Sequence, residues 1–451
     1  MLFILVDDLR PQIGCYGAAG MVTPHLDGLA GRGVRFDRAY ANNAICGASR
    51  ASMLSGLRPT PTRFVTYDAR VTADAPGVPT LATTFKRHGY HTVSNGKVYH
   101  NHDDDLEGWS EPPWLPSYEV DINIWWATEE SRALDAREGT QGPAFEAAAL
   151  PEDVYPDAQI ASRTIEDLRR LSQQDKPFFL ACGFVKPHLP FVAPQAYWGL
   201  YPADSVKLPD NMHFPYRLPE AFAYNWGELR RYFGVPKEGP LPPDLALTLI
   251  RGYYACVSFV DAQVGRVISE LDALGLADNT VVVLWSDHGF QLGEHGFWCK
   301  HTDFEVATRI PLIVVAPGIE GSRATTRLVE SVDVYPTLCE LVGLPTPEHL
   351  QGRSFVALLH DTEAEHKDAV FTRHWRSDAI RTDRYRYLET RADGGRGELQ
   401  GAGLFDLEKD PGENVNVATE PRYAAVVEEL RSRLTRHREA HFHALPPAEA
   451  P

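Results

Sequence analysis

Residues Thr280–Gly289 read Thr-Val-Val-Val-Leu-Trp-Ser-Asp-His-Gly and carry the clearest fold signal in the chain. The dense run of β-branched and apolar residues Thr280–Trp285 predicts a buried strand, and polar residues follow it at once. Upstream, apolar residues recur at helical spacing from Val257 to Leu271, and Gly275 stands near the expected helix end. A helix that leads into a buried strand is the repeating unit of α/β proteins.

The same unit recurs toward the N-terminus, each time with polar residues directly after the strand. Strands are predicted at Leu2–Val6, Tyr90–Val93 and Pro177–Val185, leading into Asp7-Asp8, Asn95–His100 and Lys186-Pro187-His188. Helices are predicted to begin after Thr80 and to run over Ile160–Leu171, each before one of these strands. We therefore predict an α/β fold with a large, mostly parallel or mixed sheet sandwiched by helices. Ligands of such sheets bind at the carboxyl ends of the strands, where the polar clusters lie.

The composition of the chain and the pattern of its predicted elements change near residue 366. Short strand-like segments rich in Arg and Tyr follow, and Tyr423–His437 has the pattern of an amphipathic helix. We predict a catalytic α/β domain over residues 1–365 and a smaller subdomain, an antiparallel sheet with a helix, over residues 366–451. Between Ser205 and Pro243 the chain is rich in Pro and aromatic residues and lacks periodicity, which indicates a surface excursion near the substrate.

Composition narrows the class of protein. The formal net charge is −17 over 451 residues, so nucleic acid and anionic membranes are not expected partners, and an anionic substrate needs a local cationic pocket. The longest uninterrupted apolar runs fall well short of the roughly 20 residues of a membrane helix. The six cysteines are scattered without CxxC pairs, which argues against a disulfide framework or a zinc site. The N-terminus has no signal-peptide pattern, so we expect a cytoplasmic protein, or an exported one if the N-terminus was trimmed.

Two acidic clusters predict a metal site. Asp7-Asp8 and Asp287-His288 each leave the end of an apolar strand. Adjacent carboxylates at a buried strand end need compensating charge, and oxygen-rich ligands favour Ca²⁺ or Mg²⁺. Each pair alone would be read as solvated turn residues, but two such pairs on one sheet favour a metal.

Cys46 and five basic residues are further candidates for a functional site. Cys46 stands where a helix is predicted to begin, ending near Gly56, and the partial positive charge of a helix N-terminus suits an anion. On spacing alone, a buried structural cysteine would be the better interpretation. The basic candidates are Arg50, Lys97, His100, His188 and Lys300. Singly each resembles a solvated surface residue, but together they could hold a tetrahedral anion.

These residues resemble the type I sulfatases of the alkaline phosphatase superfamily, most closely the iduronate-2-sulfatase branch. The family motif Cys-x-Pro-Ser-Arg with a later Leu-Thr/Ser-Gly corresponds to Cys46–Gly56. Further matching motifs, in the family's order, are Val6–Pro11, Gly96–His100, Lys186–His188, Ser286–Gly289, Leu292–Gly296 and Leu404–Asn414. The ordered set spans nearly the whole chain and is highly specific.

The resemblance implies that a maturation enzyme oxidises Cys46 to Cα-formylglycine. It implies that Asp7, Asp8, Asp287, His288 and the modified residue 46 bind Ca²⁺, with Mg²⁺ as the other candidate. It further implies that Arg50 and His100 hold and polarise the hydrated aldehyde, that Lys97 and Lys300 hold sulfate oxygens, and that His188 protonates the leaving oxygen. This sequence has Ala48 at the position of the motif's Pro. We expect this difference to affect how well the maturation enzyme recognises the segment.

The expected function is hydrolysis of a small anionic sulfate monoester, with a sulfated sugar as the substrate class that the resemblance implies. A phosphonate monoester or phosphodiester hydrolase of the same superfamily is the first alternative, because both need a cationic cradle for a tetrahedral anion. A non-catalytic anion-binding protein with an unmodified Cys46 is the second. The exact substrate, endo or exo action and the oligomeric state are open at this point.

Overall fold

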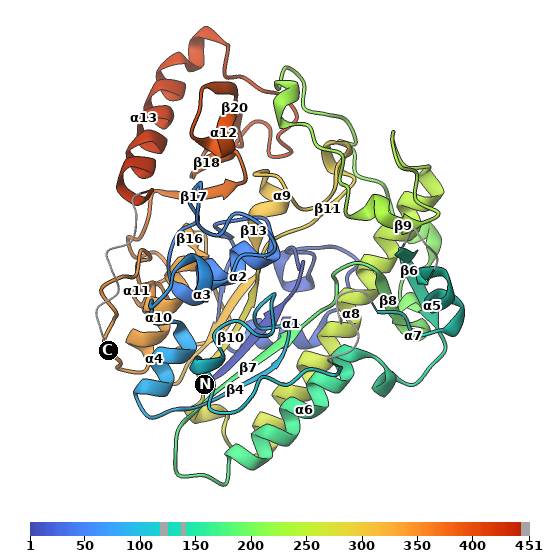
Figure 1. Cartoon of the computed structure of the whole chain (residues 1–451), viewed down its shortest axis with the longest axis vertical. Coiled ribbons are helices and arrows are strands. Elements are labelled where there is room, and N and C mark those ends of the chain that lie inside the picture. The colour runs from blue at the N-terminus through green and yellow to red at the C-terminus, as the bar shows by residue number, and fades with distance from the viewer. Residues whose placement is uncertain (118–124, 137–140, 443–451) are drawn as a thin grey trace.

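The computed structural model describes residues 1–117, 125–136 and 141–442, and a seven-stranded sheet forms its centre (Figure 1). The order across the sheet is β15 (Arg323–Thr325), β2 (Val34–Phe36), β14 (Leu312–Val315), β10 (Val282–Ser286), β1 (Leu2–Val6), β7 (Phe178–Phe184) and β4 (His91–Gly96). Strands β10, β1, β7 and β4 are mutually parallel, whereas β14 runs antiparallel to both β10 and β2. The sheet is therefore mixed, as predicted for the fold class.

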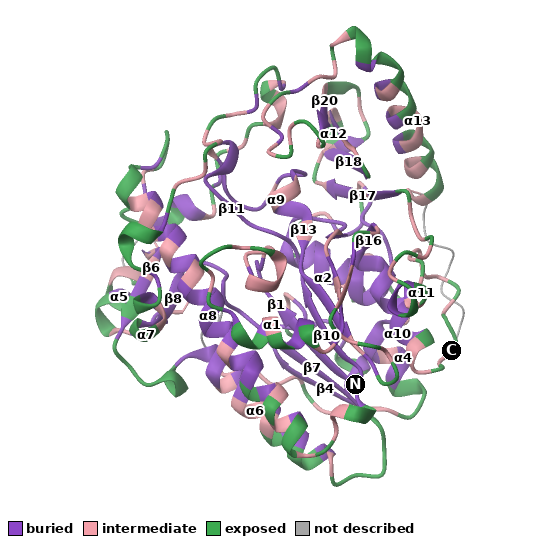
Figure 2. Cartoon of the chain, turned by 180° about the vertical axis from the view of Figure 1, so that it is seen from behind, coloured by how far each residue is buried: buried purple, intermediate pink, exposed green. Residues whose placement is uncertain are grey.

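Side chains of β1 alternate between two cores, which explains why the strand is apolar throughout. Leu2, Ile4 and Val6 pack into one core, and Phe3 and Leu5 into the other. The first core is covered by α1 (Pro24–Gly31), α6 (Pro156–Leu171) and α8 (Pro243–Ala273). The second is covered by α2 (Cys46–Ser55), α4 (Leu81–Arg87), α10 (Val334–Leu341) and α11 (Val356–His360). Figure 2 shows β1, β7 and β10 buried along their length.

Helix α8 is longer than the predicted helix and begins at Pro243. Proline is favoured in a first helical turn, since its missing N–H would have no partner there. The helix has the length and apolar composition of a membrane span, but most of that window is buried against the rest of the protein, as in a core helix.

Apart from a second sheet and the helix that packs on it, the remaining α-helices and strands of the described residues are short. They are α3 (Val71–Asp74), α5 (Glu129–Asp135), α7 (Gln195–Gly199), α9 (Glu305–Thr308), α12 (Ala392–Gly395), β3 (Ala39–Tyr40), β5 (Gln141–Pro143), β6 (Phe145–Ala148), β8 (Phe191–Pro194), β9 (Tyr232–Phe233), β11 (Gln291–Leu292), β12 (Trp298–Cys299), β13 (Arg309–Ile310) and β16 (Val329–Glu330). The excursion from Ser205 to Pro243 is only partly a surface feature, because Trp226, Leu229 and Tyr232 are buried.

A second sheet follows near the C-terminus. It is antiparallel in the order β17 (Ala369–His374), β18 (Ser377–Thr382), β19 (Tyr385–Arg391) and β20 (Leu399–Asp406), and α13 (Ala424–His441) packs on it. This agrees with the predicted antiparallel sheet and helix. The proposed boundary between residues 365 and 366 falls in the connection between α11 and β17, and it stays a prediction.

Buried polar contacts join this second sheet to the segment that carries Lys300. Arg386 of β19 donates to the Asp303 carbonyl at 2.7 Å and to the Glu305 carboxylate at 2.6 Å. The Asp303 carboxylate in turn accepts hydrogen bonds from Thr372 and Ser377. The C-terminal sheet thus supports the chain around residues 300–305.

Asp303 should make folding stability depend on pH. Burial raises the pKa of its carboxyl from 3.8 to about 7. The folded state therefore favours the protonated acid, so its stabilising contribution is full below pH 3.8 and is lost as the pH rises toward 7. We expect Asp303→Asn to become more stable relative to the wild type over this window, by on the order of 4 kcal/mol at most. Urea denaturation at several pH values measures this difference in the free energy of unfolding.

Asp368→Asn is the control, because Asp368 is exposed and pairs with Arg433 only at the surface; its stability difference from the wild type should stay small over the whole pH range. A constant stability difference between Asp303→Asn and the wild type would contradict the assignment.

Candidate active site

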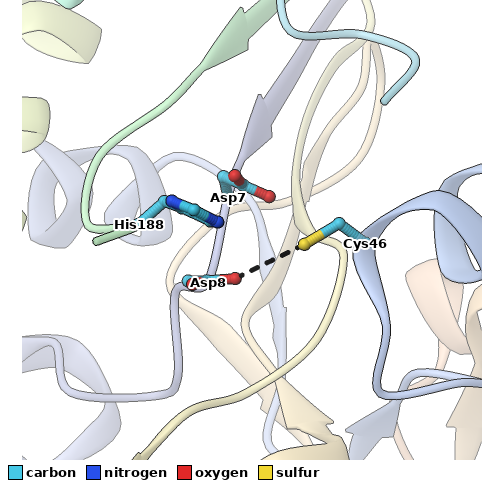
Figure 3. A group of neighbouring side chains, drawn as sticks. All are labelled: Asp7, Asp8, Cys46 and His188. Carbon is cyan, nitrogen blue, oxygen red and sulfur yellow. Dashed lines mark hydrogen bonds between the residues drawn. The ribbon is translucent and has the colours of Figure 1, made fainter. Parts of the chain in front are cut away.

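The polar clusters predicted from the sequence meet at one edge of the central sheet. Asp7-Asp8 follows β1, Asp287-His288 follows β10, Lys186–His188 follows β7, and Lys97–His100 follows β4. These four strands are parallel neighbours, so their carboxyl ends lie side by side. Figure 3 shows Asp7, Asp8 and His188 converging on Cys46, which comes from α2.

Cys46 is the first residue of α2 and is 3% exposed. Its Sγ lies 3.2 Å from His288 Nε2 and donates to Asp8 Oδ1 at 3.8 Å (Figure 3). Gly47 permits this placement, because a Cβ there would lie 1.9 Å from the Tyr67 carbonyl oxygen. Residue 46 therefore sits at a positive helix end and directly over the carboxylates.

The carboxylates are arranged as a cation site would require. Ligand atoms of Asp7, Asp8, Cys46 and His188 lie within 4.8 Å of one another, and so do those of Cys46, Asp287 and His288. Burial raises the pKa of Asp8 to about 7 despite the charge of Lys300. Such crowding of buried acids is relieved by a bound cation, and the oxygen-rich donor set suits a hard divalent ion.

Two backbone features hold this cluster together. Asp8 adopts a left-handed conformation with φ 59°, which Asp tolerates better than most residues. Its carbonyl accepts from the Tyr253 hydroxyl at 2.7 Å, and its N–H donates to Asp287 Oδ1 at 3.1 Å. The turn after β1 is thereby tied to the turn after β10.

Arg50 lies beneath the carboxylates and is fully buried. Its Nε donates to Asp287 Oδ2 at 2.9 Å and its Nη2 to Asp7 Oδ1 at 3.0 Å, while Nη1 contacts the backbone carbonyls of Lys97 and Val98. A guanidinium in this position fixes two carboxylates in orientation.

Two lysines bring positive charge to the same place. Lys97 Nζ forms an ion pair with Asp7 Oδ2, and Lys300 Nζ lies 2.9 Å from Asp8 Oδ2. Burial alone would raise the pKa of Asp7, but Lys97 and Arg50 hold it well below its ordinary value. Both ammonium groups therefore lie inside the carboxylate cluster and are buried there.

The two histidines differ in their contacts. His188 Nδ1 contacts the Leu189 carbonyl, which directs Nε2 into the site. Lys186, which was not predicted to have a role of its own, is buried and donates to the carbonyls of His188 and Pro190 at 2.9 and 2.8 Å. His100 Nδ1 is buried without a hydrogen-bond partner among the described residues, and burial with the nearby Lys97 lowers its pKa to about 4.

One acidic residue of the site, Glu228, was not predicted from the sequence. Its Oε1 lies 2.7 Å from Lys300 Nζ and 3.2 Å from His188 Nε2, and its Oε2 lies 3.4 Å from His301 Nε2. Glu228 comes from the excursion between Ser205 and Pro243. Nothing in its sequence surroundings marks it, since a lone Glu in an aperiodic segment is usually solvated.

The fold and the site define an α/β protein with a buried cluster of carboxylates, cations and imidazoles at one edge of its central sheet. The sequence profile described as "Sulfatase" matches residues 1–344, and that described as "N-sulphoglucosamine sulphohydrolase, C-terminal" matches residues 293–440. The chain belongs to the sulfatase family and is a sulfuric ester hydrolase.

Individual relatives agree with this assignment. The chain is 38% identical to iduronate 2-sulfatase of Mus musculus over 395 residues, which cover 79% of this chain and 70% of that protein. It is 30% identical to a sulfatase of Formosa agariphila over 460 residues, covering 96% and 86% of the two chains. Its structure is similar to that of phosphonate monoester hydrolase of Agrobacterium radiobacter, with a TM-score of 0.80, 26% identity and coverage of 98% and 95%.

Proposed function

We propose that the chain hydrolyses sulfate monoesters of sugars through a Cα-formylglycine formed from Cys46. The observation that carries the proposal is the position of residue 46, at a buried helix N-terminus in contact with Asp8 and His288. We propose further that Asp7, Asp8, Asp287, His288 and residue 46 hold one divalent cation, Ca²⁺ or Mg²⁺. Three carboxylates, the oxygens of a modified residue 46 and one imidazole match the preference of these ions for oxygen donors.

The bound cation would supply Lewis-acid activation at residue 46. As a hydrated aldehyde, residue 46 would supply one hydroxyl as the nucleophile toward sulfur and a second to expel sulfate. Lys97 and Lys300 hold the sulfate oxygens, and His188 gives the proton at Nε2 to the leaving oxygen as the sulfur–oxygen bond breaks. Arg50 keeps the carboxylates of Asp7 and Asp287 in place, and His100 stands beside this group as a neutral imidazole that can accept or donate.

The sugar preference rests on the relatives and on a small cavity beside the site. The mouse relative is an iduronate 2-sulfatase. A cavity of about 70 Å³ lies between the excursion and the β17–β18 hairpin and is lined in part by Tyr224, His301, His374 and Trp375. Trp375 is 55% exposed there, and the Arg376 guanidinium lies 5.4 Å from the centre of its ring.

Phosphonate monoester hydrolysis is the second candidate. The structures of two phosphonate monoester hydrolases match this fold with TM-scores of 0.80 and 0.79. Both reactions need a cationic pocket that binds a singly charged tetrahedral group. The ratio of kcat/KM on an aryl sulfate to that on an aryl phosphonate monoester separates the two functions.

The first test is the mass of the peptide Ile45–Arg58 from the purified protein. We expect a loss of about 18 Da at Cys46, the difference between a thiol and an aldehyde. Cys46 is 3% exposed in the folded protein, so the maturation enzyme must reach it before the chain folds.

An unmodified thiol in the first preparation calls for co-expression with a formylglycine-generating enzyme, because Ala48 replaces the usual Pro. A thiol that persists after co-expression would contradict the formylglycine proposal.

A further inference from the structure

Glu228 lies in a backbone segment whose neighbouring side chains are buried, and its own carboxylate contacts the site. It immediately precedes the 3₁₀ turn Leu229–Arg231, and Leu229 is fully buried. Close to Glu228 in the chain, the Arg230 guanidinium also stacks 3.3 Å from the centre of the Trp226 ring. These two anchors fix the backbone around Glu228, so its side chain is presented to the site and not to bulk solvent.

The Glu228 carboxylate shares its partners with the substrate. Its Oε1 contacts Lys300 Nζ at 2.7 Å and His188 Nε2 at 3.2 Å. In the proposed reaction, Lys300 holds a sulfate oxygen and His188 Nε2 meets the leaving oxygen. The ester and Glu228 therefore contact the same two nitrogen atoms, which places a fixed carboxylate within a few ångströms of the substrate's charge.

The carboxylate is negatively charged in this setting. Burial alone would raise the pKa of Glu228, but Lys300, His188 and His301 hold it well below its ordinary value. Lys300 already pairs with Asp8, so its charge is divided between two carboxylates when a substrate arrives. Each further negative charge on a substrate then meets repulsion that Lys300 only partly offsets.

We propose that Glu228 is a charge-selecting residue that favours singly charged tetrahedral esters over doubly charged phosphate monoesters. Sulfate monoesters and phosphonate monoesters carry one negative charge, whereas phosphate monoesters, with a second pKa near 6, carry about two above pH 7. The three groups have similar shape, so charge is what separates them at this position. The inference rests on the proposed function, because it requires the ester to sit between residue 46 and His188.

The experiment compares wild type and Glu228→Gln, both with residue 46 converted, on 4-nitrophenyl sulfate, 4-nitrophenyl phenylphosphonate and 4-nitrophenyl phosphate at pH 8. Glutamine keeps the shape and removes the charge. We expect the phosphate-to-sulfate ratio of kcat/KM to rise by at least about tenfold, the scale of one unit charge a few ångströms away at an effective dielectric near 20. The phosphonate-to-sulfate ratio should stay within about twofold, because both esters carry the same charge.

Two further variants serve as controls. Glu228→Asp keeps the charge and should keep the wild-type ratios, even if its absolute rates fall. Glu220→Gln removes an exposed carboxylate of the same excursion and should leave all three rates unchanged. Aryl esters carry no sugar hydroxyls, so a sugar contact of Glu228 would not influence these ratios.

The outcomes separate the hypotheses. If Glu228→Gln lowered kcat/KM on all three esters by the same factor, Glu228 would only position His188 and Lys300. That result would overturn charge selection. An unchanged phosphate-to-sulfate ratio would overturn it as well. If the converted wild type cleaved no sulfate ester at all, the proposed function itself would fail, which is a different result from either.

Discussion

Cys46→Ala is expected to lower kcat/KM on an aryl sulfate by roughly 10⁴- to 10⁶-fold, the range seen when a covalent nucleophile is removed. The methyl group of Ala offers neither an attacking oxygen nor a route for expelling sulfate. The fold should persist, because residue 46 makes few packing contacts that a methyl group cannot supply at the start of α2. Steady-state kinetics measures the loss, and thermal unfolding tests whether the protein is folded.

Cys339→Ala is the matched control. Cys339 is also a free, buried cysteine in a helix, but it lies in α10 and outside the site. This variant should retain its activity apart from a small loss of stability. Substantial turnover by Cys46→Ala would remove residue 46 as the nucleophile.

Asp287→Asn is expected to lower metal content and activity together, with activity falling by at least about 100-fold. Asp287 accepts from Arg50 and from the backbone N–H groups of Asp8 and His288, so it is central to the carboxylate cluster. Removing its charge weakens cation binding, and the remaining groups no longer have a fixed geometry. Elemental analysis gives the metal content, and the loss of chelator-sensitive thermal stability gives a readout independent of activity.

Asp378→Asn provides the comparison for burial and ion pairing. Asp378 is a buried carboxylate that pairs with Arg373 and Arg438 in the C-terminal subdomain. Its substitution should cost stability without changing metal content. Full metal content in Asp287→Asn, with activity lost, would show that Asp287 orients the site without binding the ion.

Much of the fold could be predicted because its buried strands are long and apolar. β1, β7 and β10 are buried on both faces, so their sequences stand out as continuous runs between polar ends. β2 and β14 could not be predicted, since three or four residues carry no period. The antiparallel direction of β14 is likewise set by tertiary packing and not by its own sequence.

The candidate site followed from the ends of those strands. Residues that directly follow a predicted strand, such as Asp7 and His188, could be assigned to one edge of the sheet from their sequence positions alone. Glu228 could not, because its position depends on how an aperiodic segment folds back over the sheet. Arg50 was identified as a cation, but its contacts beneath Asp7 and Asp287 depend on the orientation of α2.

The central position of β1 has a consequence for synthesis. The strand pairs with β7 and β10, and Cys46 contacts His288, which is 242 positions further along the chain. At about 5–20 residues per second, a ribosome needs roughly 12 to 50 s to make that interval. During this time α2 can pack on α3 and α4 but still lacks α10 and the segment Ser331–Asp333, so we expect residue 46 to stay accessible to a modifying enzyme. Under the proposed conversion of Cys46, we expect slower translation to raise the fraction of molecules that carry the modified residue.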